Sequence, residues 1–527
     1  MDAATFENEL TVLTHRQEGT IDEFHRSYEA AIDDVRSTFG NVHPHLIGGH
    51  ERSSEDTYRV TSPGATDVVV GRFAAGDATD VDEAVRAAAE AFDPWRDTHW
   101  SERVAIFREA ADIIRSRKYD LAALLTLENG KNRTEAMADI DEGIDFLRLY
   151  ARELERHDGY RMETGEPTPG QHCSSRLEPF GVFGVIGPFN FPFAIFSGMT
   201  TGAAITGNTV VTKPAPATSL IAHKFVEILF ESGVPDGVVN LVTGSGREVG
   251  QPLVRHEDVR GIVFTGSLEV GREIQQTFVE LNKSGPVIAE LGGKNSVIVT
   301  SSADLEKAVE GVKAGAFGFS GQKCSATARV YVDEAVLDPF IRTLVNETEE
   351  LSIVPPEQRD AFISPLIDDA AVERYERICR SARETGSIET GGRICADPEL
   401  SSGRYVEPTV VTDVPHEHEL AREEHFLPFV TIHPVGDLEE ALHKANDSRF
   451  GLCAGIFSEA DADIERWLQA IEAGMCYVNR HQSATTGALV QAQPFGGWKA
   501  SGTTNKFAGG YWYLPQFMRE QTRTVVT

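Results

Sequence analysis

The hydrophobic and polar positions of this chain divide it into a mainly helical first part and a longer part in which strands and helices alternate. Apolar residues recur at helical spacing over residues 80–155, with a break at Gly130, Lys131 and Asn132, and this spacing predicts successive amphipathic helices. A shorter helical pattern at about 18–38 leads into a segment rich in His, Pro and Gly that predicts a loop up to residue 50. Residues 51–75 alternate polar and β-branched side chains and predict a hairpin.

From residue 180 the pattern becomes one of short apolar runs separated by helical segments. Predicted strands cover 180–188, 208–213, 239–242, 261–264, 287–290 and 296–299, with helices at about 193–206 and 217–232. A second set, between about 300 and 495, includes strands at 328–332, 429–433, 454–456 and 476–478. Such alternation is typical of parallel, doubly wound sheets, so the predicted fold class is α/β.

Two segments outside this alternation predict extended structure. Residues 157–176 contain several Gly and Pro and few long apolar side chains, which indicates an extended or hairpin excursion. The last 20 residues alternate and predict a tail strand. At 527 residues the chain exceeds one ordinary core, so two or more lobes are expected.

Composition narrows the class of protein. A hydrophobic content of 41% and a charged content of 25% are typical of a globular protein. No apolar run reaches the roughly 18 residues that a membrane-spanning helix needs. The first residues lack the basic and apolar regions of a secretory signal, so we expect a cytoplasmic protein without a membrane partner.

The net charge of −32 argues against binding to nucleic acid or to anionic membranes. Self-repulsion on this scale costs stability in dilute buffer and is screened by salt. One hypothesis is therefore a protein that works in a high-salt cytoplasm; the alternative is an acidic surface that only aids solubility. The six cysteines are scattered without close pairs, which argues against a disulfide framework or a zinc knuckle.

Cys324 is the strongest candidate for chemistry. It follows a glycine-rich segment, has Lys323 beside it, and lies 34 residues after Glu290. A thiol near a cation is a plausible nucleophile because the thiolate is the attacking form. A glutamate within reach could then activate a water. The pair predicts an enzyme that forms and hydrolyses a thioester.

Two turns at strand ends are candidates for binding a nucleotide. Gly244 and Gly246 follow one predicted strand, although the third glycine is one residue too far along for the usual dinucleotide fingerprint. Gly266 and Ser267 follow the next, where Ser267 can cap a helix and free amides would attract a phosphate. Either turn alone could be an ordinary βα connection, but two adjacent ones favour a nucleotide crevice.

Two further side chains lie at strand ends. Asn190 follows a strand and a Gly-Pro pair, where its amide could donate to a developing oxyanion or only satisfy its own backbone. Lys213 ends another strand, where a cation either meets a ligand or is simply solvated. His416, His418 and His425 are interleaved with glutamates but lack the spacing of a catalytic zinc site, so we interpret them as an acidic surface stretch and predict no metal.

Taken in order, Asn190, Lys213, Gly266-Ser267, Glu290 with its Leu-Gly-Gly-Lys extension, Cys324 and the Pro-Phe-Gly-Gly at 494–497 resemble the aldehyde dehydrogenase superfamily over about residues 45–525. The resemblance implies a Rossmann-like NAD-binding lobe (1–156 and 177–291), an α/β catalytic lobe (292–495) and a small β oligomerisation hairpin (157–176 and 508–527). It also implies a homo-oligomer.

Within that superfamily the chain is most similar to the glutamate γ-semialdehyde dehydrogenases, also called 1-pyrroline-5-carboxylate dehydrogenases. The likeness rests on Ser325 after the nucleophile, on the segments 479–490 and 493–502, and on 513–517. It implies that Ser325 and the backbone amides of Gly487 and Ala488 hold the substrate's α-carboxylate. Phe191 and Phe495 would flank its aliphatic stem, and Glu142 would meet its α-ammonium.

The resemblance implies oxidation of L-glutamate γ-semialdehyde to L-glutamate in proline breakdown. Cys324 would attack the aldehyde, Asn190 would hold the oxyanion, and Glu290 would activate the hydrolytic water. The cofactor-binding residues would be Lys213, Gly244, Gly266, Ser267, Glu424 and Phe426.

The sequence departs from the family in two places, at Pro216 and in the loop that contains His425 and Leu427. Pro216 stands where many members place a glutamate that binds the adenosine ribose and repels a 2′-phosphate, which weakens exclusive use of NAD. NAD is still favoured, and NADP stays open. His425 and Leu427 replace an isoleucine and a glycine. Alternatives are a dehydrogenase of another short semialdehyde, such as succinate semialdehyde, or a non-catalytic binding protein on the same fold. A functional link to proline dehydrogenase is expected.

Overall fold

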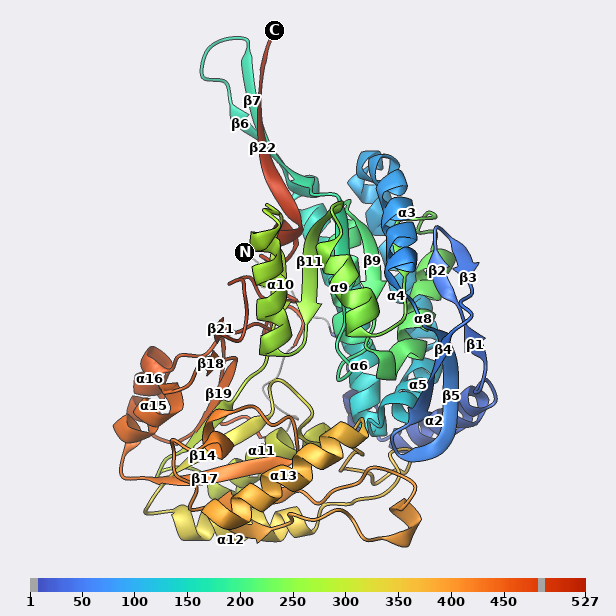
Figure 1. Ribbon diagram of the computed structural model, residues 1–527. Coiled ribbons are helices and arrows are strands. Elements are labelled where there is room, and N and C mark those ends of the chain that lie inside the picture. The colour runs from blue at the N-terminus through green and yellow to red at the C-terminus, as the bar shows by residue number, and fades with distance from the viewer. Residues whose placement is uncertain (1–7, 482–488) are drawn as a thin grey trace.

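The computed structural model describes residues 8–481 and 489–527. It contains two large α/β lobes, each built on a seven-stranded sheet, and a three-stranded arm that projects from the first lobe (Figure 1). Within the described ranges, no helix combines the length and apolar character that crossing a membrane requires.

The first sheet has the strand order β12-β11-β8-β9-β10-β2-β3, and the five strands from the edge strand β12 to β10 are parallel. Their bounds confirm the predicted alternation: β8 Val182–Ile186, β9 Thr209–Lys213, β10 Val239–Leu241, β11 Val259–Thr265 and β12 Val287–Glu290. All of these strands are almost entirely buried, as expected for a parallel sheet covered by helices on both faces.

The predicted loop before residue 50 is wrong in part, because β2 (His45–Ile47) and β3 (His50–Arg52) extend the first sheet as an antiparallel hairpin. Gly48 and Gly49 form its two-residue turn with φ of 61° and 77°. A Gly-Gly pair is a signal for this turn, because both central residues need positive φ. Each strand is only three residues long, which hid the pattern.

Ten helices of the described chain belong to or cover the first lobe. They are α1 Thr11–Gln17, α2 Ile21–Arg36, α3 Ala78–Asp97, α4 Trp100–Ser116, α5 Lys118–Asn129, α6 Arg133–Arg156, α7 Ala194–Ile205, α8 Ser219–Glu231, α9 Gln251–Arg255 and α10 Leu268–Glu280. The predicted break is confirmed: Gly130 ends α5 with a φ of 84°, a backbone conformation that favours glycine.

The predicted hairpin also forms, as β4 (Thr57–Ser62) paired with β5 (Ala65–Ala74), and β1 (Val42–His43) joins β5.

The second sheet has the order β15-β16-β17-β14-β13-β19-β20. Its strands are β13 Asn295–Val299, β14 Thr327–Asp333, β15 Ser387–Thr390, β16 Thr409–Thr412, β17 Phe429–Val435, β19 Cys453–Phe457 and β20 Met475–Val478. The sequence did not predict β15 and β16. Both have four residues, and β15 is an edge strand that pairs only with β16.

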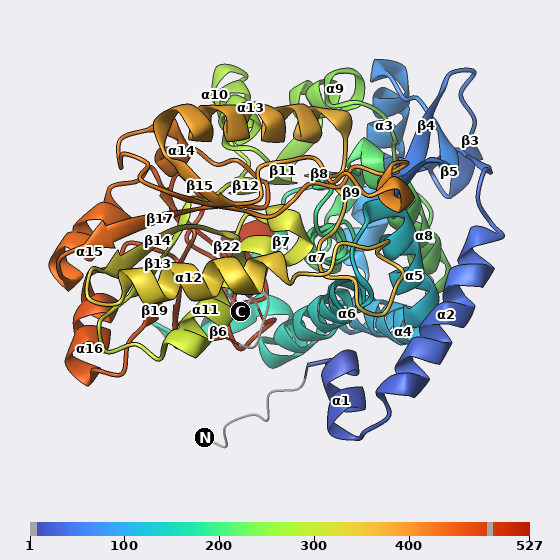
Figure 2. The ribbon, with the colours of Figure 1, turned by 90° about the horizontal axis from the view of Figure 1, so that it is seen from below.

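Helices cover both faces of this sheet. They are α11 Leu305–Phe317, α12 Leu337–Glu349, α13 Asp369–Thr385, α14 Glu419–Arg422, α15 Leu438–Asn446 and α16 Asp461–Ala470. Figure 2 shows α13 on one side of the strands and α12 on the other. The two faces alternate along a strand: Val410 packs with α11 and α12, whereas Val411 packs with α13.

The projecting arm consists of β6 (Arg161–Gly165), β7 (Gln171–Pro179) and β22 (Met518–Val526). The hairpin and the tail strand predicted from the sequence are confirmed as elements. The structure adds that the tail strand pairs with β7 along nine residues, from Met518 opposite Pro179 to Val526 opposite Gln171. Most β22 side chains are exposed, including Val525 and Val526.

A small antiparallel pair of strands, β18 (Phe450–Gly451) with β21 (Trp498–Lys499), lies beside the second lobe.

Candidate active site

One buried cavity brings together six of the fifteen site residues singled out from the sequence. Glu142, Phe191, Glu290, Cys324, Ser325 and Phe495 all line it, and so do the aromatic side chains Phe146, Tyr150, Phe264 and Tyr513. These residues come from α6, from the ends of first-lobe strands, from the start of the second lobe and from the C-terminal segment. The cavity is therefore a largely apolar pocket with a few convergent polar groups, as small-molecule sites usually are.

Cys324 is held by a strained turn. The 3-10 segment Gly318–Gly321 contains Phe319 and Ser320 at φ of 50° and 52°, which is rare for residues with a side chain. Ser320 Oγ donates to the Ser364 carbonyl at 2.5 Å, and Asn295 Nδ2 donates to the Cys324 carbonyl at 2.8 Å. Backbone strain of this kind persists only where surrounding bonds impose it, and it clusters at functional sites.

The electrostatics around the thiol correct one sequence-based argument. Burial, and then the carboxylates of Glu424 and Glu290, raise the pKa of the Cys324 thiol, while the amides of Ser325 and Cys324 lower it. Lys323 does not offset this, because its ammonium lies 2.5 Å from Glu135 Oε1 on α6. The expectation that the neighbouring lysine favours the thiolate is wrong.

Glu290 ends β12 and is buried against the second lobe. Burial raises the pKa of its carboxyl well above the usual range, and a hydrogen bond from the Gly497 amide opposes that shift. Its Oε2 atom has no hydrogen-bond partner among the described residues. A buried carboxyl with a raised pKa and a free oxygen is suited to proton transfer.

Asn190 and Phe191 follow β8 at the mouth of the sheet. The Phe191 N–H donates to Asn190 Oδ1 at 3.1 Å, which leaves the NH₂ end of the amide as the group that can donate. Asn190 is 3% exposed. Ser325 is also buried, and Phe495 is fixed by paired backbone hydrogen bonds with Ala508. Gly487 and Ala488 lie outside the described residues.

Glu142 lies on the face of α6 that meets the cavity. Burial, and then the nearby carboxylate of Asp139, raise the pKa of Glu142 to about 8. At neutral pH this side chain is therefore mostly a neutral carboxylic acid. In its neutral form it can donate or accept a hydrogen bond toward a substrate, and a cation beside it would favour the charged form.

A second cavity lies at the carboxyl ends of the first-lobe strands. Lys213, Gly246 and Gly250 line it together with Ile186, Val254 and Ile274. Burial lowers the pKa of Lys213 to about 8, and its Nζ donates to the Pro214 carbonyl at 2.8 Å. A Cβ on Gly246 would meet no atom within 4 Å, so this glycine leaves its backbone open to the crevice.

The other predicted cofactor glycines have structural contacts of their own. A Cβ on Gly244 would lie 2.6 Å from Val249 Cγ2, and one on Gly266 would lie 2.5 Å from the Phe264 ring. The Gly266 N–H donates to the Glu290 carbonyl at 3.2 Å, so it is already satisfied. Ser267 caps α10 as predicted, accepting from the Val270 N–H at 3.3 Å.

Glu424 and Phe426 alternate with two buried residues, His425 and Leu427. Glu424 Oε1 accepts from the Gly293 N–H at 2.9 Å, and burial raises the pKa of this carboxyl to about 7. The Phe426 ring packs edge-on against Phe189, with centroids 5.8 Å apart. His425 and Leu427 are buried in the second lobe instead, so the two departures from the family pattern change packing rather than the crevice.

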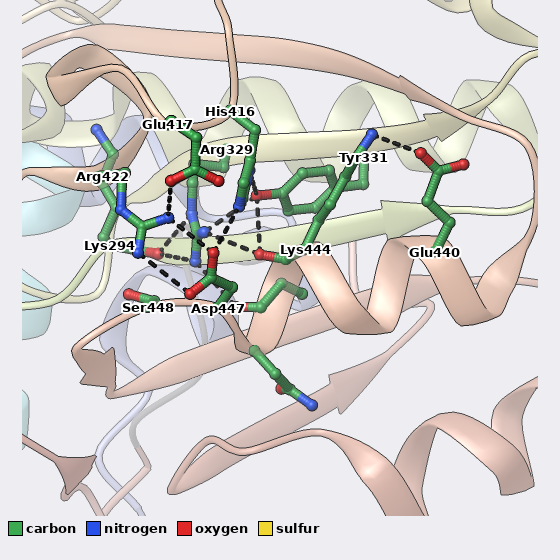
Figure 3. Close-up of polar contacts among 12 residues, drawn as sticks. Lys294, Arg329, Tyr331, His416, Glu417, Arg422, Glu440, Lys444, Asp447 and Ser448 are labelled. Carbon is green, nitrogen blue, oxygen red and sulfur yellow. Dashed lines mark hydrogen bonds and ion pairs between the residues drawn. The ribbon is translucent and has the colours of Figure 1, made fainter.

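The interpretation of the histidines as a surface stretch is wrong for His425, which is 9% exposed and bonds the Leu420 carbonyl at 3.1 Å. His416, Glu417 and Asp447 bring possible ligand atoms within 4.8 Å of one another. Figure 3 shows Arg422 between them. Its Nη1 lies 3.0 Å from Glu417 Oε2 and 2.8 Å from Asp447 Oδ2, so a guanidinium already supplies the positive charge that these carboxylates face.

Sequence reasoning missed the aromatic walls of the first cavity. Tyr150 and Tyr513 stack with ring centroids 5.4 Å apart, and both line the cavity beside Glu290. Tyr150 lies in the middle of a helical pattern, where an aromatic residue usually indicates core packing. Nothing in its local sequence distinguishes it from such a residue.

Comparison with known proteins agrees with this geometry. The model of the aldehyde dehydrogenase family matches residues 50–523. A 1-pyrroline-5-carboxylate dehydrogenase of Geobacillus thermodenitrificans is 38% identical over 508 residues, covering 95% of this chain and 96% of the relative. The chain therefore belongs to the aldehyde dehydrogenase family.

Solved structures show the same likeness. A 1-pyrroline-5-carboxylate dehydrogenase from Thermus with bound NAD is 35% identical, with a TM-score of 0.92 and complete coverage of both chains. Proline utilization A from Bdellovibrio bacteriovorus is 34% identical with a TM-score of 0.94. This chain matches over its whole length but spans 54% of that longer protein.

Proposed function

We propose that this protein oxidises L-glutamate γ-semialdehyde, the open form of 1-pyrroline-5-carboxylate, to L-glutamate with NAD. The observation that carries the proposal is the convergence of Cys324, Glu290 and Ser325 in one apolar cavity walled by Phe191 and Phe495. The names of the relatives support the choice of substrate. A non-catalytic protein would have no use for a strained nucleophile turn beside a buried carboxyl.

In the proposed mechanism Cys324 attacks the aldehyde carbon and forms a C–S bond. The oxyanion that results would accept from the Asn190 NH₂ and the Cys324 N–H. After hydride leaves the carbon, a thioester joins the acyl group to the sulfur. Glu290 then takes a proton from water, which adds to the thioester, and the thiol is released with L-glutamate.

The second cavity fits a dinucleotide. Its apolar side chains would suit a base, the open backbone at Gly246 would suit a phosphate, and Lys213 in its wall would bind a ribose. Glu424 and Phe426 do not line this cavity, and their roles at the second ribose and the nicotinamide rest on the family resemblance. When bound, NAD would supply the acceptor for the hydride, and its positively charged ring would favour the Cys324 thiolate. Pro216 is exposed at the end of β9 and supplies no carboxylate against a 2′-phosphate, so NADP stays open as a cofactor.

A substrate panel tests the function. With NAD, we expect kcat/KM for L-glutamate γ-semialdehyde to exceed that for succinate semialdehyde by about 10-fold or more, because Ser325 lies where an α-carboxylate would be bound. Steady-state reduction of NAD and of NADP with each aldehyde gives both preferences. An equal or greater kcat/KM for succinate semialdehyde would assign the protein to the alternative substrate.

The acidity of the chain predicts that its thermal stability depends on salt concentration. We propose that the protein is adapted to high salt, because a net charge of −32 repels itself in dilute buffer. The melting temperature should rise by more than about 5 °C between roughly 0.1 M and 2 M KCl. A flat or falling melting curve across that range would leave only the solubility explanation.

Three finer points belong to the same proposal. The arm formed by β6, β7 and β22 serves association between copies, since its edge strand β22 exposes a nine-residue length of backbone and the side chains of Val525 and Val526. The protein works in the cytoplasm. The semialdehyde reaches it from a proline dehydrogenase, a coupling suggested by the likeness to proline utilization A.

A further inference from the structure

Lys131 and Asp139 form a fully buried ion pair beside the cavity, and the mechanism above does not use it. Their side chains are 0% exposed, and Lys131 Nζ lies 2.8 Å from Asp139 Oδ2. Lys131 occupies the break between α5 and α6, and Asp139 lies two turns into α6. Burying two charges is costly and seldom adds net stability. We therefore expect a function of this pair in the neighbouring cavity.

The ammonium of Lys131 touches the aromatic wall of the cavity. Its Nζ atom lies 3.6 Å from the centroid of the Phe191 ring and 5.2 Å from that of Phe319. Phe191 lines the cavity, and Phe319 belongs to the turn that leads to Cys324. A cation within about 6 Å of a ring face attracts the ring, and the attraction grows where water is excluded.

Asp139 fixes the same segment through its backbone. Its Oδ1 atom accepts from the Ala194 N–H at 2.7 Å, at the first residue of α7 and three residues after Phe191. One carboxylate therefore holds the ammonium behind the Phe191 ring and the chain that carries that ring. Burial lowers the pKa of Lys131, and the Asp139 carboxylate opposes this shift and favours the charged ammonium.

The pair belongs to one acidic face of α6. Glu135, Asp139 and Glu142 are spaced four and three residues apart, so they lie in a row along the helix. Glu135 binds Lys323 beside the nucleophile, Asp139 binds Lys131 behind Phe191, and Glu142 reaches the cavity. A single helix thus places groups on the nucleophile side and on the substrate side of the pocket.

We propose that Lys131, held by Asp139, is a positioning residue that fixes the Phe191 ring against the aliphatic stem of the substrate. The inference rests on the proposed function, because it takes Phe191 as a wall of the semialdehyde site. The Phe319 turn has its own bonds from Ser320 and Gln322, so it does not depend on the ammonium. Loss of the cation should therefore weaken binding of substrates with a stem more than it slows chemistry.

The test compares two aldehydes. In Lys131→Met, kcat/KM for L-glutamate γ-semialdehyde should fall by about 10-fold, mainly through KM, whereas kcat/KM for acetaldehyde, which has no stem, should change by less than about 2-fold. The double variant Lys131→Met with Asp139→Asn removes both charges and keeps an oxygen for the Ala194 N–H. It should show the same selective loss, and it replaces the single variant if that one does not fold.

Lys283→Met is the matched control. Its Nζ lies 5.0 Å from the Phe278 ring, and Lys283 lines neither cavity, although it donates to the carbonyl of Val254 in the wall of the second. The ratio between the two aldehydes should therefore stay at the wild-type value. Equal losses on both aldehydes, or no loss, in the folded Lys131 variant or the double variant would overturn the positioning role. A wild-type protein that does not oxidise the semialdehyde would instead overturn the proposed function.

Discussion

Replacing Cys324 by alanine should reduce NAD-dependent oxidation of the semialdehyde by about 10⁴-fold or more, while the dinucleotide still binds. Cys324 carries the only thiol among the residues that line the described cavity. Cys324 does not line the second cavity. The affinity of Cys324→Ala for NAD, measured by calorimetric titration, should therefore remain close to that of the wild type.

The matched control is Cys476→Ala. This thiol is also partly buried, and its pKa is likewise raised by burial, but it lies on β20 outside both cavities. Its kcat should stay near the wild-type value. If Cys324→Ala retained substantial turnover while folded, the nucleophile would have to be a different group.

Replacing Glu290 by glutamine should lower steady-state turnover by about 10²–10⁴-fold and leave the first hydride transfer in place. Glutamine preserves the shape of the side chain and can still accept from the Gly497 amide. It cannot take a proton from water. Rapid mixing with NAD should therefore give a burst of reduced cofactor of up to one equivalent per active site, followed by a slow phase.

Glu142→Gln serves as the comparison, because it changes a second carboxyl in the same cavity that the mechanism does not use as a base. It should change KM for the semialdehyde without producing a burst. A Glu290→Gln enzyme with linear, undiminished turnover would transfer the role of the base to another group.

The alternating pattern between 180 and 299 predicted β8 to β13, because buried parallel strands are apolar runs that need no partner to be recognised. Gly130 likewise indicated the end of α5, since a positive φ is a local requirement. The family was also predictable, because its pattern is distributed over nearly the whole chain.

What the sequence could not predict depends on contacts between distant residues. Lys323 lies next to Cys324 in sequence, yet its ammonium pairs with Glu135, 188 residues away. Lys131 stands out in the sequence only as part of a helix break, but folding buries it between Asp139 and Phe191. The short β15 and β16 form only because β17 provides a neighbour. The roles of the individual site residues remain predictions.

The most direct test is the mass of the Cys324 peptide from Glu290→Gln protein mixed with L-glutamate γ-semialdehyde and NAD and quenched in acid. Acid keeps the α-amine protonated, so the amine does not displace the thiol. We predict that this peptide gains the mass of one glutamyl group, and that omission of NAD leaves it unchanged. A burst of reduced cofactor without any acyl group on Cys324 would contradict the account.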